Sequence, residues 1–130
     1  MKMAEEIDAP LKALRVLVAE DNAFIGMLYA DLLVEMGHTV CAIEVTESEA
    51  VAAATLYNPD LMIVDAALGE GTGVSAVEKI LRAGSVPHVF VSGDVVSVRA
   101  VRPDAIVLQK PFRDQDLARA IQRALSASNC

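Results

Sequence analysis

The chain has 130 residues, of which 54% are hydrophobic, and this is enough apolar material for one compact domain with a single core. Its formal net charge of -7 argues against binding to a nucleic-acid backbone, because such binding needs clustered Lys and Arg, and the eleven cations here are scattered. The acidity favours bound cations instead.

Residues 1–14 are interpreted as a polar leader interrupted by Pro10, after which short apolar runs alternate with segments of helical periodicity. Five of the apolar runs are rich in Val and Ile and have the length of strands. The predicted strands are Arg15–Glu20, Thr39–Ile43, Leu61–Asp65, His88–Ser92 and Ala105–Leu108.

The segments between the runs are predicted helices. In the first, apolar residues recur at helical spacing before Gly37, a natural helix stop, and they are Ile25, Leu28 and Leu32. The second opens with Thr46 and Glu49 at the spacing of a capping box. Its predicted buried face consists of Ala50, Ala53, Ala54 and Tyr57.

Two further helices follow the same pattern later in the chain. Apolar residues mark one helix before Gly84, and they are Val74, Val77 and Leu81. A last helix begins near Asp114, with Leu117, Ile121 and Leu125 on its apolar face. Strands buried on both faces and separated by helices imply a parallel sheet with right-handed crossovers, so the fold class is an α/β three-layer sandwich.

Neither cysteine forms part of a recognisable site. Cys41 and Cys130 lie far apart, with no CxxC pair and no His spacing around them, so neither zinc nor a disulfide framework is indicated. The sequence has no run of about 18 apolar residues that could span a membrane, and its start lacks the apolar core of an export signal. We therefore expect a cytoplasmic protein with no membrane association.

Chemistry-bearing residues stand where the predicted strands end. In a parallel α/β sheet, ligands bind outside the carboxyl ends of the strands, so these residues would meet at one rim. They are Glu20 and Asp21, Asp65, Ser92, and Lys110 with Pro111.

Three carboxylates at one rim make a hard-oxygen site for a divalent ion. Mg²⁺ suits such a site, because it accepts a few carboxylates and keeps several waters, and it would relieve the repulsion between Glu20 and Asp21. Each residue alone has an ordinary explanation, since acids often follow strands as helix caps or in solvated turns. Four strand ends that all supply compatible chemistry indicate a functional site more strongly than any one of these residues does.

From Arg15 to Leu125 the sequence resembles the receiver domain of bacterial two-component response regulators. The resemblance is carried by the pair Glu20-Asp21, "PDLMIVDAAL" with Asp65, "VFVSGD" with Ser92 and "LQKPF" with Lys110-Pro111. It implies a flavodoxin-like fold with a five-stranded parallel sheet in the order 2-1-3-4-5, and a receiver domain over residues 15–128. It also implies a Lys110–Pro111 bond in the cis form.

The resemblance further implies a phosphoacceptor. Asp65 would take a phosphoryl group from a histidine kinase or a histidine phosphotransfer protein, and the phosphorylated domain would switch its contacts with a downstream protein target. Mg²⁺ would be ligated by Asp21, Asp65 and the main-chain carbonyl of Ala67, with Glu20 holding it largely through water. Ser92 and Lys110 would hold the phosphoryl oxygens.

Three features depart from the family pattern. The loop "AALGEGTG" after Asp65 has Gly69 where the family usually has Pro, and its three glycines predict a pliable loop. Fewer positions separate Ser92 from Lys110 than is common, which predicts a short or irregular fourth helix. Val107 stands where many receivers carry a switch aromatic.

Other classes of protein are alternatives to a phosphorylated receiver. A phosphatase of the haloacid dehalogenase type also uses a strand-end Asp, but it needs a second Asp two residues on, where this chain has Ala67. A degenerate receiver that only binds proteins is the stronger alternative. A DNA-binding output would require a longer protein, so we expect a stand-alone receiver that binds no nucleic acid and is no enzyme beyond its own phosphoryl transfer and dephosphorylation.

Overall fold

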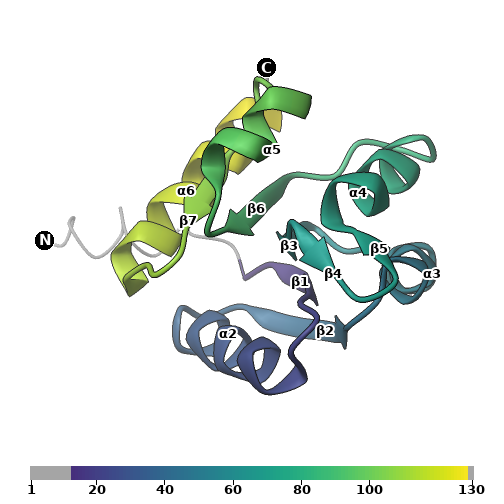
Figure 1. The fold of residues 1–130 in the computed structure, drawn as a ribbon. Coiled ribbons are helices and arrows are strands. Elements are labelled where there is room, and N and C mark those ends of the chain that lie inside the picture. Colours follow the sequence, from purple (N-terminus) through teal and green to yellow (C-terminus); the bar gives the residue numbers. More distant parts are fainter. Residues whose placement is uncertain (1–12, 129–130) are drawn as a thin grey trace, which may run out of the picture.

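The computed structural model describes residues 13–128, so most of the predicted leader, including Pro10, and also Cys130 lie outside the described residues. Twelve elements follow one another along this part of the chain (Figure 1). They are β1 (Arg15–Ala19), α2 (Ala23–Glu35), β2 (Thr39–Glu44), α3 (Glu47–Tyr57), β3 (Leu61–Asp65), β4 (Ala67–Leu68), β5 (Gly71–Thr72), α4 (Gly73–Leu81), β6 (His88–Ser92), α5 (Val95–Val101), β7 (Val107–Gln109) and α6 (Asp114–Ser128).

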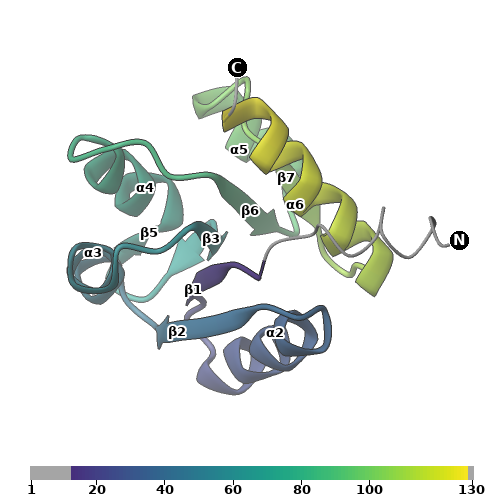
Figure 2. The same ribbon diagram turned by 180° about the vertical axis from the view of Figure 1, so that it is seen from behind.

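The main sheet has five parallel strands in the order β2-β1-β3-β6-β7. Counted along the chain without the short β4 and β5, this is the predicted order 2-1-3-4-5, and the flavodoxin-like fold is confirmed. Figures 1 and 2 show the helices arranged on either side of the sheet.

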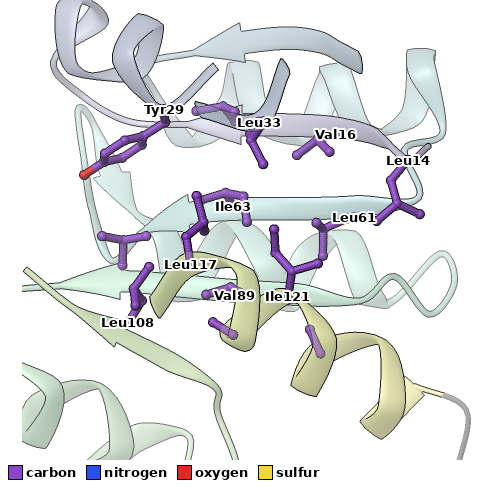
Figure 3. Close-up of a cluster of buried hydrophobic side chains, with 14 residues drawn as sticks. Leu14, Val16, Tyr29, Leu33, Leu61, Ile63, Val89, Leu108, Leu117 and Ile121 are labelled. Atoms are coloured by element: carbon purple, nitrogen blue, oxygen red, sulfur yellow. The ribbon is translucent and has the colours of Figure 1, made fainter. Parts of the chain in front are cut away.

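Alternate residues of the strands build two cores, because successive side chains of a strand point to opposite faces. Figure 3 shows one core, in which Val16 and Ile63 of the sheet pack against Leu33 of α2 and Leu117 of α6. The other core joins the sheet to α3, α4 and α5, and Phe90 of β6 is fully buried in it. The sheet is therefore covered by helices on both faces, and functional side chains are left to its ends.

The predicted strand bounds are close to the observed ones. β3 and β6 begin and end as predicted, while β1 ends at Ala19, one residue early, and β2 continues to Glu44. The last strand begins at Val107, two residues later than predicted, because Ala105 still belongs to the turn in which its N–H donates to the carbonyl of Arg102.

The predicted buried faces of the helices are partly wrong. In α2 the side chain of Leu28 is 48% exposed, and the buried residues are Gly26, Tyr29 and Leu33. Of the three residues noted at helical spacing, Ile25 and Leu32 are partly buried against the core, and Leu28 is exposed because this helix also carries apolar residues on its outer face. In α3 the three alanines are buried and Thr46 caps the helix by accepting from the N–H of Glu49, as predicted, but Tyr57 is exposed.

Two features of the later chain agree with expectation. Among the five helices of residues 13–128, the fourth, α5, has only seven residues, and α6 begins at Asp114. Within residues 13–128, none of the helices has the length and apolarity needed to cross a membrane.

The loop after Asp65 forms a short hairpin, which its glycine content did not predict. β4 and β5 form an antiparallel hairpin in which Ala67 lies opposite Thr72 and Leu68 opposite Gly71. The turn is fastened to the preceding loop, because the N–H of Gly69 donates to the carbonyl of Val45. Its glycines permit close approach to neighbours rather than mobility.

Candidate functional site

Three acidic side chains meet at the carboxyl end of the two central strands. Glu20 and Asp21 follow β1, and Asp65 ends β3. The two strands pair with Ala19 beside Val64, so the next positions, Glu20 and Asp65, are level. Carboxylate oxygens of all three residues lie within 4.8 Å of one another, with Glu20 and Asp65 buried and Asp21 exposed. The three predicted acids are thus brought together.

Glu20 carries a carboxylate oxygen that lacks a hydrogen-bond partner among the described residues. Its Oε2 accepts a hydrogen bond from the N–H of Asn22 at 3.0 Å, but its buried Oε1 has no hydrogen-bond partner among residues 13–128. Burial first, and then the neighbouring Asp65 and Asp21, raise the pKa of Glu20 to about 8. A buried acceptor without a donor is rare in folded proteins, and a hard cation would satisfy it, so the donor set fits Mg²⁺.

Both oxygens of Asp65 are held. Oδ1 accepts from the N–H of Ala67 at 2.8 Å, and Oδ2 accepts from Nζ of Lys110 at 2.5 Å. Lys110 reaches the rim from the end of β7, where its N–H donates to the carbonyl of Ser92. Burial alone lowers the pKa of Lys110, but the hydrogen bond to Asp65 and the charges of Asp65 and Glu20 outweigh it, so the net shift is upward. The Lys110–Pro111 bond is cis.

Ser92 ends β6, next to β3. The register pairs Asp65 with Val91, so Ser92 follows one position along on the neighbouring strand. Its hydroxyl is nearly buried and accepts a hydrogen bond from the N–H of Asp94. The Asp94 carboxylate caps α5, with its oxygens accepting from the N–H and the hydroxyl of Ser97.

The hairpin directs the main chain of Ala67 towards Asp65. Its ladder is carried by the bond from the N–H of Gly73 to the carbonyl of Ala66, which makes Ala67 and Thr72 a pair without mutual hydrogen bonds. In such a pair the N–H and C=O of each residue point outward, on the same edge of the strand. The N–H of Ala67 is held by Asp65, so its carbonyl faces the same side.

Sequence reasoning missed the buried carboxylate of Glu47. It lies at the start of α3 and accepts hydrogen bonds from the N–H of Thr72 and from the hydroxyl of Ser75, while Lys79 forms an ion pair with it. The local pattern held no signal for this role, because an acid directly after a capping Thr is ordinary at a helix start.

Comparisons with known proteins agree with this geometry. The family model described as response regulator receiver domain matches residues 16–122. Transcriptional regulatory protein PdtaR of Mycobacterium tuberculosis is 35% identical over 116 residues, which cover 86% of this chain and 57% of that protein. Phyllosphere-induced regulator PhyR of Methylorubrum extorquens is 31% identical, over 87% of this chain and 44% of that protein.

Solved structures give the same result. The solution structure of the receiver domain of PhyR from Erythrobacter litoralis superposes with a TM-score of 0.83 at 27% identity, and covers 92% of this chain and 95% of that domain. The chain spans about half the length of the two regulators above. Its sequence match, its parallel sheet and its cluster of strand-end residues lead to one conclusion: the chain belongs to the response regulator receiver domains of two-component signalling.

Proposed function

We propose that the protein is a phosphoacceptor, which takes a phosphoryl group from a histidine kinase or a histidine phosphotransfer protein onto Asp65 and thereby switches its contacts with a downstream protein. The observation that carries this proposal is the position of Asp65. It ends the central strand, where carboxylate oxygens of Glu20 and Asp21 lie within 4.8 Å and the ammonium of Lys110 forms an ion pair with it.

In this proposal Mg²⁺ is held by Asp21, Asp65 and the main-chain carbonyl of Ala67, with Glu20 contributing largely through water. The oxygen without a partner on Glu20 and the outward direction of the Ala67 carbonyl support the assignment. When bound, the ion supplies positive charge that offsets the charge of the transferring phosphoryl group.

Asp65 supplies the nucleophilic oxygen. A bond forms between this oxygen and phosphorus while the phosphorus–nitrogen bond of the donor histidine breaks, and the donor imidazole keeps the electron pair. Lys110 neutralises charge on the transferred group, and the hydroxyl of Ser92 gives a directed hydrogen bond to one of its oxygens. The fold positions these groups in advance, which is the main contribution that phosphoryl transfer requires from a protein.

The proposed domain is residues 15–128, preceded by a leader over residues 1–14, and it acts in the cytoplasm. Its partners are proteins: a kinase or phosphotransfer protein upstream and a protein target downstream. The net charge of -7 supports protein partners rather than direct contact with nucleic acid. The domain catalyses only its own phosphoryl transfer and dephosphorylation.

Incubation with acetyl phosphate or a donor kinase plus Mg²⁺, followed by intact mass measurement, tests the proposal. We expect the wild type to gain one phosphoryl group and Asp65→Asn to gain none. Labelling of that variant at the wild-type rate on the same peptide would show that Asp65 is not the acceptor. A wild type that no competent donor labels would instead favour a protein-binding module that works without phosphorylation.

A further inference from the structure

A second buried carboxylate joins three elements beside the Asp65 pocket. Glu47, the first residue of α3, is 7% exposed. Its Oε1 accepts from the N–H of Thr72 on β5 at 3.0 Å, and its Oε2 accepts from the hydroxyl of Ser75 on α4 at 2.6 Å. Nζ of Lys79, also on α4, lies 2.7 Å from Oε2. A buried charge is stable only with such partners, so this site is fully built.

A short chain of contacts connects Glu47 to Asp65. Thr72, which donates to Glu47, lies directly opposite Ala67 in the hairpin, and Ala67 donates to Asp65. Ala67 and Thr72 form no hydrogen bond with each other, so their N–H groups point away from the hairpin. Each of these N–H groups donates to a carboxylate. Asp65 accepts from Ala67 and Glu47 accepts from Thr72, so a carboxylate is hydrogen-bonded to each outer edge of the hairpin.

Two glycines of the hairpin allow the main chain to approach these two acidic residues. Gly71 has φ of +128°, and a Cβ placed on it would collide with the carboxylate of Glu47. A Cβ on Gly73 would collide with the carbonyl oxygen of Asp65. The main chain therefore approaches both acids more closely than a residue with a side chain would allow.

We propose that Glu47 is a positioning residue, which fixes the main chain of Ala67 beside Asp65 and so sets the affinity of the pocket for Mg²⁺. The carboxylate of Glu47 is bonded to Thr72, Ser75 and Lys79, so it acts on the pocket through the hairpin. The inference rests on the proposed function of Asp65, because it assigns the held carbonyl of Ala67 to that ion.

Glu47 stays ionised at physiological pH, so its hydrogen bonds to Thr72 and Ser75 are made to a charged acceptor. Hydrogen bonds to an ionised acceptor are about twice as strong as neutral ones. The hydrogen bond from Lys79 first, and then those from Ser75 and Thr72, lower the pKa of Glu47 to about 2. The hairpin is thus held in the same way across the pH range in which the pocket would bind its ion.

Two measurements on ion-free and Mg²⁺-titrated protein test this role. Calorimetric titration gives the Mg²⁺ affinity, and amide hydrogen exchange reports how firmly the N–H of Ala67 is held without the ion. In Glu47→Ala we expect an affinity about tenfold lower, as for other residues that orient metal ligands, and faster exchange at Ala67. In Glu47→Gln we expect most of the affinity to remain, since its amide oxygen still accepts from Thr72 and its amide nitrogen can donate to Ser75.

A matched control separates positioning from loss of stability. Ala53→Gly changes a buried residue of the same helix and lowers helix stability, but it leaves the hydrogen bonds of Glu47 to the hairpin and to α4 in place. We expect it to reduce Tm and leave the Mg²⁺ affinity unchanged. If Glu47→Ala fails to fold, Ser75→Ala, which removes one bond to the carboxylate, is expected to weaken Mg²⁺ binding in the same direction by a smaller factor.

The outcomes distinguish this inference from the proposed function. Normal Mg²⁺ binding and normal Ala67 exchange in folded Glu47→Ala would overturn the positioning role alone, as would an equal loss of affinity in Ala53→Gly. A wild type that binds no Mg²⁺ would overturn both the proposed function and this inference.

Discussion

Nζ of Lys110 lies 3.7 Å from Oε1 of Glu20, the buried oxygen that has no hydrogen-bond partner among residues 13–128. Lys110 donates to Asp65 instead, at 2.5 Å. One ammonium therefore faces a cluster of three acidic groups, and even with Glu20 protonated the two aspartates leave negative charge in excess at the rim. This imbalance determines how the cluster should respond to mutation and to added cations.

Asp21→Asn should raise the stability of the ion-free protein by up to about 1 kcal/mol, because it removes a negative charge that lies beside Asp65 and the buried Glu20. It should also reduce the rise in Tm that Mg²⁺ produces, since stabilisation by a bound ion increases with the logarithm of its concentration divided by its Kd. Asp65→Asn should reduce the Mg²⁺ effect as well, but without the ion-free gain, because it loses the pair with Lys110.

Thermal melts with and without Mg²⁺ measure both effects. Asp31→Asn, the same change of charge at an exposed position of α2, is the control and should leave the Mg²⁺ shift unaltered. Unchanged shifts in both cluster variants would contradict the assignment of the ion to these acids.

Glu47 should contribute stability that depends on pH. Its pKa is about 2 in the folded protein against an ordinary value of 4.5, so its contribution is complete above pH 4.5 and is lost as pH falls towards 2. Glu47→Ala should therefore cost about 2 kcal/mol at pH 7, with Lys79 discounted because it is half exposed. Urea unfolding of both proteins from pH 7 to pH 2 checks this, and a difference that stays constant over that range would contradict it.

The phosphorylated state should be long-lived. Hydrolysis needs a water directed at phosphorus, and the residues two positions after Asp65 and two after Ser92 are Ala67 and Asp94. Ala67 has no side chain that could orient a water, and the carboxylate of Asp94 is engaged in capping α5 through Ser97. Intact mass followed over time should show the label persisting for minutes, and its loss within seconds from isolated protein would refute the expectation.

Activation should change the backbone of Gly93–Asp104 more than any other segment. Val107 has no ring to swing into a vacated space, it is stiff about χ1, and it is buried beside the short helix α5. A switch then needs a loosely held segment with two arrangements, and the seven-residue α5 with its flanking turns supplies one. Amide spectra with and without a beryllofluoride phosphoryl mimic decide the matter, and changes centred on α2 with Gly93–Asp104 unaltered would contradict it.

The sheet and the pocket could be predicted from sequence because their signals are local. Each strand is a short Val- and Ile-rich run, and each pocket residue stands directly at the end of such a run, so the topology of a parallel sheet brings them together. The same reasoning identified Thr46 as a helix cap, since the capping bond spans three residues. None of these inferences required knowledge of distant contacts.

The hairpin after Asp65 could not be predicted in that way. Its glycines suggested mobility, whereas Gly71 is required by Glu47 and Gly73 by the main chain of Asp65. The bond between Glu47 and Thr72 joins positions far apart in the chain, and no local pattern announces it. The burial of Gly26 in α2 also depends on a distant contact, because this residue lies tightly against Ile43 of the neighbouring strand.

The two bonds to Asp65 have a consequence for timing. With Oδ1 held by Ala67 and Oδ2 by Lys110, the carboxylate loses its rotational freedom when the chain folds and not when a donor arrives. The entropy of ordering the nucleophile is therefore absent from the activation barrier of the encounter. We expect the rate of phosphoryl transfer to depend instead on how often the ion pair between Lys110 and Oδ2 of Asp65 opens.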